Sequence, residues 1–156
     1  MKLRDFVLTD AIIPQLGSTQ RDEVIAELID PLLAAGAAPP ELRDTLVAEI
    51  LKREKNGSTG FGKGVAIPHV KHAQISKVAA AVGVSPTGID YNALDKQPVY
   101  SVFMLLSPAD QPDQHLHAME TIFANLQNDT FRSFLRQAET HDAITTLLDE
   151  ADAEEL

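Results

Sequence analysis

The sequence predicts an α/β protein in which one mixed β-sheet is covered by helices on both faces. Two amphipathic helical patterns come first, apolar runs typical of strands fill the middle, and three helical patterns close the chain. Elements in this order fit a sheet between two helical layers. The 156 residues contain no repeat and no linker. We therefore expect a single domain over 1–156, with an acidic, frayed tail at about 149–156.

The first two helices are predicted from apolar side chains that recur every three or four residues. Ser18 or Thr19 is expected to cap a first helix over about 18–35. Pro31 lies inside this pattern, so a kink or an early end is expected there. A second helix over about 39–55 begins at two prolines and ends before an Asn-Gly pair.

Strands are predicted from short apolar runs. They lie at 65–67, 77–84 and 99–106, and 88–91 fits a further short strand. The run at 99–106 is apolar throughout, which suits a central strand buried on both faces. Three helices are expected after it, at about 113–127, 130–137 and 140–150.

Composition narrows the classes of function. The absence of cysteine excludes disulfides, thiolate nucleophiles and cysteine-based zinc sites. The net charge of −10 disfavours nucleic acid and anionic lipid as partners and favours a protein with a basic face, unless it serves only solubility. No apolar run approaches the roughly 20 residues of a membrane span, and no signal-peptide pattern opens the chain. We expect a cytoplasmic protein without direct membrane insertion.

A glycine-rich stretch over 57–64 follows the second helix. Its first seven residues match a phosphate-binding P-loop, but Gly64 stands where Ser or Thr would bind magnesium. The stretch also follows a helix and precedes a strand, the reverse of a P-loop, so we reject that assignment. Four glycines within eight residues exceed the needs of a tight turn. They favour a loop shaped around an anion or a partner.

Three side chains are candidates for one site. His69 follows Pro68 at the end of a predicted strand, beside the glycine loop. At about 100° per residue, Arg53 falls next to Leu42 on the apolar stripe of the second helix, and a buried cation calls for an anion. His115 shares a helix face with Met119 and lies in the first turn. There the helix dipole favours a neutral imidazole and a nearby anion.

Together these residues suit metal-free phosphoryl transfer. One imidazole would accept the phosphoryl group, while a second imidazole, an arginine and backbone N–H groups stabilise its oxygens. Structural alternatives are a surface histidine for His69, a dipole-pairing cation for Arg53 and a hydrogen-bonded core histidine for His115. No metal site is expected, because His115 and His117 diverge on a regular helix. His69 and His72 have no carboxylate companions.

Two segments resemble the motifs of a known family. The segment 53–69, REKNGSTGFGKGVAIPH, closely resembles the active-site signature of the fructose–mannitol class of enzyme IIA in the bacterial phosphoenolpyruvate-dependent phosphotransferase system. The segment 108–117, PADQPDQHLH, is similar to the second characteristic block of that family. The resemblance spans roughly residues 3–148 and is strongest to the nitrogen-regulatory branch.

The resemblance implies a three-layer α/β/α fold with a mixed sheet of about five strands. It implies a phosphotransferase without cofactor, in which His69 carries the phosphoryl group on Nε2 and Arg53 and His115 stabilise it. Phosphate-binding positions of the loop would be Ser58, Thr59, Gly60 and Gly62. The rim that contacts partners would comprise Phe61, Lys63, Val70 and Lys71. Lys63 and Val70 depart from the usual family residues, which affects partner choice.

The implied donor is the phosphocarrier HPr or its nitrogen-branch counterpart, itself charged by an enzyme I that uses phosphoenolpyruvate. A regulatory protein would change its binding to target proteins with its phosphorylation state. A sugar-specific component would instead pass the phosphate to a separate IIB protein. A binding module without chemistry is disfavoured by the presence of His69, Arg53 and His115. The residues of the two motifs resemble the nitrogen-regulatory branch most, which favours the regulatory function.

Overall fold

The centre of the molecule is one mixed sheet. The computed structural model describes residues 1–156 and contains six strands in the order β1-β5-β6-β3-β2, with β4 also pairing with β6. β5 runs antiparallel to β6, whereas β3 and β4 run parallel to it. The strands are β1 (Val7–Ile13), β2 (Gly60–Gly62), β3 (Val65–Ala66), β4 (His69–His72), β5 (Ala79–Ile89) and β6 (Val99–Pro108).

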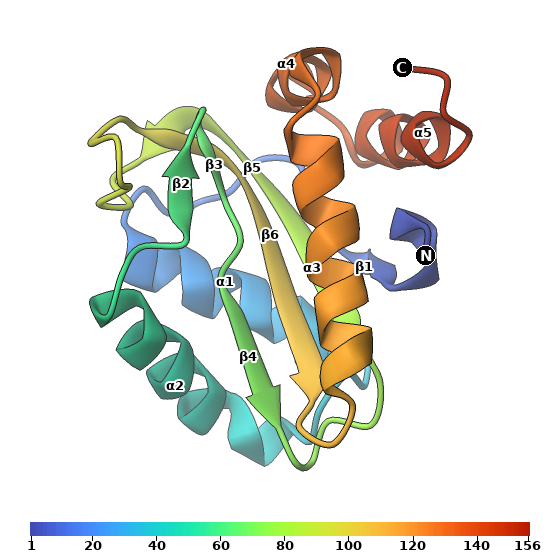
Figure 1. The fold of residues 1–156 in the computed structure, drawn as a ribbon. Coiled ribbons are helices and arrows are strands. Elements are labelled where there is room, and N and C mark those ends of the chain that lie inside the picture. Colours follow the sequence, from blue (N-terminus) through green and yellow to red (C-terminus); the bar gives the residue numbers. More distant parts are fainter.

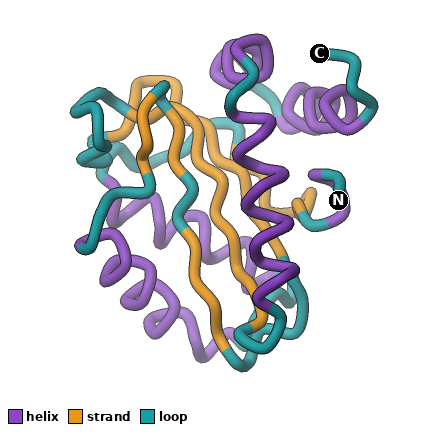
Figure 2. Tube along the Cα trace, viewed as in Figure 1, coloured by secondary structure: helices purple, strands orange, loops and turns teal.

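Helices cover both faces of the sheet, which confirms the predicted layers. One layer is formed by α1 (Arg21–Ala34) and α2 (Arg43–Lys55). The other contains α3 (Pro112–Leu126), α4 (Asp129–Gln137) and α5 (His141–Asp152) (Figure 1). Figure 2 shows the strands between the two groups of helices. No helix has both the length and the apolar character needed to cross a membrane.

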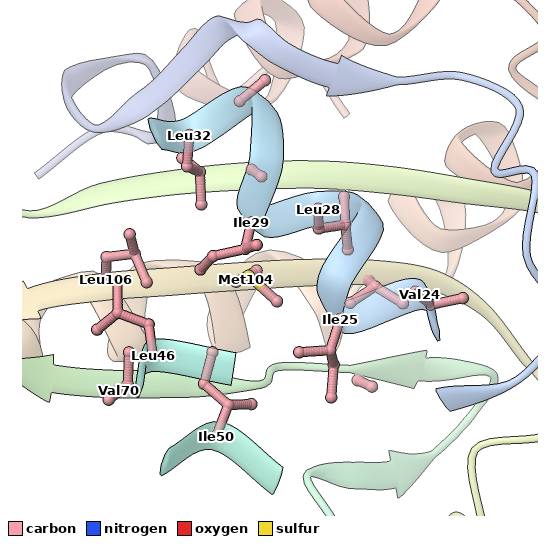
Figure 3. Packing of buried hydrophobic residues seen from close by; sticks show 14 of the residues in the cluster. Val24, Ile25, Leu28, Ile29, Leu32, Leu46, Ile50, Val70, Met104 and Leu106 are labelled. Atoms are coloured by element: carbon pink, nitrogen blue, oxygen red, sulfur yellow. The ribbon is translucent and has the colours of Figure 1, made fainter. Parts of the chain in front are cut away.

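β6 separates two apolar cores. Val102, Met104 and Leu106 face the core beneath α1 and α2. Phe103 and Leu105 face the core beneath the other helical layer. Side chains alternate between the two faces of a strand, so this continuous apolar run fills both cores. Figure 3 shows the first core, where residues from α1, α2 and β4 gather around Met104 and Leu106.

The sheet differs from the prediction in its number of strands. The predicted strands 77–84 and 88–91 form one strand, β5, while Val7–Ile13, Gly60–Gly62 and His69–His72 form strands that were not predicted. The strand β2 shows why. Three residues with glycine at both ends give little signal for a strand. Gly60 is required there, because a Cβ at this position would lie 2.9 Å from the Cβ of Ala93. The sheet therefore has six strands.

The start of α1 differs from the prediction. The helix begins at Arg21 with Gln20 as its N-cap, so the caps predicted at Ser18 and Thr19 are wrong. The carboxylate of Glu27 instead accepts hydrogen bonds from the backbone N–H groups of Gly17 and Ser18, at 2.8 and 3.1 Å. This side chain from within the helix fixes the preceding turn.

Pro31 does not end α1 early. The helix continues through it to Ala34. Proline removes one helical N–H donor, but here it stands three residues before the helix ends. Little helix beyond it could be disrupted.

The acidic C-terminal segment is not frayed as predicted, because its side chains bind the N-terminal turn. Asp149 forms a 2.8 Å ion pair with Arg4. Asp152 accepts hydrogen bonds from the backbone N–H groups of Leu3 and Arg4, at 2.7 and 2.9 Å. The helix α5 accordingly extends to Asp152.

Candidate functional site

His69 is the first residue of β4, and its ring is held by the backbone. Pro68 separates β4 from β3, so His69 begins a strand instead of ending one as predicted. Its Nδ1 lies 2.8 Å from the carbonyl oxygen of Ile67. A carbonyl oxygen only accepts, so Nδ1 carries the proton of the neutral ring. The lone pair is therefore on Nε2, which is the nucleophilic nitrogen.

The surroundings of His69 keep its ring neutral. Burial lowers its pKa below the ordinary value of 6.5, and the hydrogen bond to the Ile67 carbonyl opposes this effect. The positive charge of Arg53 lowers the pKa further, while the carboxylate of Glu54 raises it. With its pKa lowered, the ring is neutral at pH 7, the state in which imidazole acts as a nucleophile.

His115 lies beside His69, as the sequence predicted for two inward histidines. The centroids of the two rings are 5.4 Å apart and the ring planes are inclined at 54°. His115 is half-buried in the first turn of α3, and its Nδ1 lies 2.7 Å from the hydroxyl oxygen of Ser107. Burial, followed by the positive charges of a protonated His69 and of Lys71, lowers the pKa of His115 to about 4.

The lowered pKa of His115 should make the free energy of unfolding depend on pH in mild acid. The unfolded chain takes up a proton on His115 near its ordinary pKa of 6.5, whereas the folded protein resists protonation until about pH 4. The free energy of unfolding should therefore fall as the pH drops through this window.

The variant His115→Gln tests this expectation. Urea unfolding at a series of pH values gives the dependence of the unfolding free energy on pH, and this dependence should be weaker in the variant than in the parent. His117→Gln, an exposed histidine on the same helix, is the control. Equal slopes in both variants would contradict the assignment.

Arg53 reaches the glycine loop, but it is exposed and not on the buried stripe of α2 as predicted. The buried residues of this helix are Leu46, Ile50 and Glu54. The predicted stripe included Leu42, which lies in a 3-10 turn before the helix, and this shifted its centre toward Arg53. The Arg53 Nη1 donates a 2.8 Å hydrogen bond to the carbonyl of Gly57.

Glu54 is a buried acidic residue beside the site, and the sequence analysis did not identify it. Its carboxylate accepts hydrogen bonds from the backbone N–H of Thr59 at 3.0 Å, from the Thr59 hydroxyl and from the Tyr91 hydroxyl at 3.0 Å. Burial raises the pKa of Tyr91, so this hydroxyl keeps its proton and donates. Glu54 thereby ties the glycine loop to the end of α2. The available signal was its position four residues after Ile50, one helical turn along the buried face.

Several donors of the glycine loop are occupied within the protein. The backbone N–H and the hydroxyl of Thr59 bind Glu54, and the N–H of Gly60 donates to the Ser58 hydroxyl oxygen at 3.0 Å. Gly60 and Gly62 both lie in β2. Among the predicted phosphate-binding positions, the Ser58 hydroxyl hydrogen has no acceptor in the structure. Ser58 is thus the side chain of this group that can still donate.

The four residues predicted to form a rim do not share one surface. Val70 is buried in the core beneath α1 and α2 (Figure 3), because residues alternate along β4 and its neighbours His69 and Lys71 point the other way. The ring of Phe61 packs against Phe123 of α3, with centroids 4.9 Å apart. The other two rim residues, Lys63 and Lys71, are exposed. Val70 is therefore wrong as a rim residue.

Lys63 lies away from the histidines, on the side of the β2–β3 hairpin near α4. Its Nζ is 3.3 Å from the side-chain oxygen of Gln127. It lines a hollow with Tyr100, Arg132 and Arg136. The guanidinium of Arg136 stacks 3.5 Å above the ring of Tyr100. Lys63 therefore belongs to a separate basic surface.

Known proteins share both sequence and fold with this chain. Residues 5–151 match the family described as "Phosphoenolpyruvate-dependent sugar phosphotransferase system, EIIA 2". The chain is 39% identical to a nitrogen regulatory protein of Klebsiella oxytoca, over 83% of this chain and 76% of that protein. It is 33% identical to a fructose-specific EIIA component of Haloferax volcanii, over 83% of each. A fructose-specific EIIABC component of Bacillus subtilis is 34% identical over 97% of this chain, which spans 24% of that longer protein.

Solved structures with the same fold include nitrogen regulatory protein IIA-Ntr from Neisseria meningitidis. It superposes with a TM-score of 0.81 and 23% identity, over 92% of this chain and 97% of that one. Mannitol IIA from Escherichia coli gives a TM-score of 0.76 with 19% identity, over 90% and 97% of the two chains. A mannitol IIA in complex with phosphorylated enzyme IIB gives 0.74 with 18% identity, over 90% and 94%. The predicted three-layer fold is thus one that known IIA proteins adopt.

Proposed function

We propose, because the chain belongs to the EIIA type 2 family of the phosphoenolpyruvate-dependent sugar phosphotransferase system, that it carries a phosphoryl group on Nε2 of His69. One observation supports this most strongly. The hydrogen bond from Nδ1 to the Ile67 carbonyl leaves Nε2 as the free nitrogen, and the ring of His115 lies 5.4 Å from that of His69. A neutral nucleophile thus stands next to a second imidazole and near a guanidinium.

The transfer itself needs only these groups and a phosphorylated donor. The lone pair of Nε2 forms a new bond to phosphorus while the bond to the donor's nitrogen breaks, and the donor imidazole leaves with that electron pair. The Nδ1 proton stays on His69, facing the Ile67 carbonyl. Arg53 uses one N–H for the Gly57 carbonyl, so other donors of its guanidinium remain for the phosphoryl oxygens.

The surface beside His115 suits a protein donor. Leu116 is 55% exposed and Phe123 is 46% exposed, both on α3, and Phe61 packs against Phe123. Large apolar side chains that gather on a surface mark interaction sites. We propose that a phosphohistidine carrier, HPr or its nitrogen-branch counterpart, docks here to bring its phosphoryl group to His69.

A direct experiment tests this function. The protein is incubated with enzyme I, each carrier in turn and phosphoenolpyruvate, and its intact mass is measured. We expect one phosphoryl group per chain. Because a phosphohistidine is a phosphoramidate, the label should be lost in acid and survive in base. No gain of mass with either carrier would refute the proposal.

We further propose that the protein is mainly a regulator of the nitrogen branch. Its similarity to nitrogen regulatory proteins extends over most of both chains. Phosphorylation adds roughly −1.5 to −2 charges at neutral pH to a chain whose net charge is already −10. This local change can repel an acidic partner or release an apolar one. The alternative, transfer to a separate IIB in sugar uptake, is favoured by the similarity to fructose-specific components.

A comparison of bound proteins separates the two functions. A His69→Ala bait represents the unphosphorylated state, and enzymatically phosphorylated protein represents the other. We expect at least one cellular target besides the carrier to bind only one state. If the two sets differ only in the carrier and a IIB protein, and purified IIB accepts the phosphate rapidly, the protein serves sugar transport instead.

A further inference from the structure

Ser107 connects the central strand to the second histidine. It is fully buried near the end of β6, opposite Lys71 of β4, and Leu105 two residues earlier lies opposite His69. The Ser107 hydroxyl oxygen is 2.7 Å from Nδ1 of His115. The same strand that positions His69 through β4 therefore also contacts the ring of His115.

The direction of this hydrogen bond follows from burial. Nδ1 of His115 is the sole hydrogen-bond partner of the Ser107 side chain, and no buried polar side-chain atom is unpaired. If His115 donated instead, the buried hydroxyl hydrogen of Ser107 would have no acceptor, which is costly. The hydroxyl therefore donates to Nδ1. The proton of the neutral His115 ring must then be on Nε2.

The two histidines consequently hold opposite tautomers. His69 is protonated on Nδ1, which leaves Nε2 as a nucleophile. His115 is protonated on Nε2, the one ring nitrogen left to donate to a phosphoryl oxygen. Reversing the His115 tautomer would turn a lone pair toward those oxygens. The tautomers thus divide the two roles between two identical side chains.

We infer that Ser107 is a positioning residue that fixes His115 as an Nε2 hydrogen-bond donor to the phosphoryl group. The catalytic part of this inference rests on the proposed function. The same contact also opposes protonation of His115, because a protonated ring would have to donate from Nδ1 and would leave the serine hydrogen without an acceptor. Burial and the charges of His69 and Lys71 lower the pKa of His115 independently of this contact.

The test begins with the unphosphorylated protein. The ¹⁵N chemical shifts of its histidine rings are measured near pH 7, where they distinguish the two tautomers. We expect the parent to carry the proton of His115 on Nε2. In Ser107→Ala, we expect the ring to lose this fixed tautomer and its pKa to rise. Ser101→Ala is the matched control, since Ser101 is buried on the same strand. A parent protonated on Nδ1 overturns the inference, even if Ser107→Ala does not fold.

The second measurement is the rate of phosphoryl transfer onto His69 at a series of pH values. Loss of one buried hydrogen bond should slow Ser107→Ala roughly tenfold. Ser107→Thr, which keeps the hydroxyl, should transfer faster than Ser107→Ala, and Ser101→Ala should match the parent. An unchanged rate and tautomer in folded Ser107→Ala overturn the inference. Failure of the parent to accept phosphate contradicts the proposed function alone, because the tautomer is measured without phosphate.

Discussion

His69→Gln should gain no phosphate when it is incubated with enzyme I, a carrier and phosphoenolpyruvate. The Nε2 lone pair of His69 is the proposed nucleophile, and an amide cannot replace it. The side chain is partly exposed at the start of β4, so the fold should survive the change. Intact mass spectrometry measures the outcome directly.

His72→Gln is the matched control for this experiment. His72 ends the same strand, and its Nδ1 accepts a hydrogen bond from the backbone of Gln74 at 3.0 Å. We expect this variant to be phosphorylated like the parent. A His69→Gln variant that is labelled as well as the parent would show that another residue accepts the phosphoryl group.

Arg53→Met should slow phosphoryl transfer about a hundredfold. Loss of one preorganised donor to a developing anion costs on the order of 3 kcal/mol. The Arg53 guanidinium donates a hydrogen bond to the carbonyl of Gly57, and its positive charge lowers the pKa of His69. The measurement is the single-turnover rate of transfer from a phosphorylated carrier.

Lys52→Met provides the control for charge. Lys52 is exposed on the same turn of α2, so both variants lose one cation from one helix end. We expect near-parent transfer in Lys52→Met and unchanged thermal unfolding in both variants. Equal rates in the two variants would remove Arg53 from the site.

The sequence predicted the layers of the fold because its patterns are local. The period of α2 and the apolar run of β6 were each visible within a short window. The apolar face of its helix also predicted that His115 points inward, and its ring lies beside that of His69. The strands β1, β2 and β4 were missed, and β2 gives little signal because its backbone pairing does not depend on apolar side chains.

Other errors came from contacts that no local pattern contains. Asp152 binds the backbone of Leu3 from 149 residues away, which holds a tail that composition alone marks as frayed. Arg53 was placed on the wrong face because Leu42 belongs to a 3-10 turn and not to α2. Ser107 gave no signal, since its role depends on how β6 and α3 meet.

The central claim is that the phosphoryl group resides on Nε2 of His69. The most direct measurement is ³¹P–¹⁵N coupling by NMR in the enzymatically phosphorylated, ¹⁵N-labelled protein. We predict coupling of phosphorus to Nε2 of His69, with Nδ1 still protonated and donating to the Ile67 carbonyl. Coupling to Nδ1 of His69, or to a nitrogen of any other residue, would contradict this account.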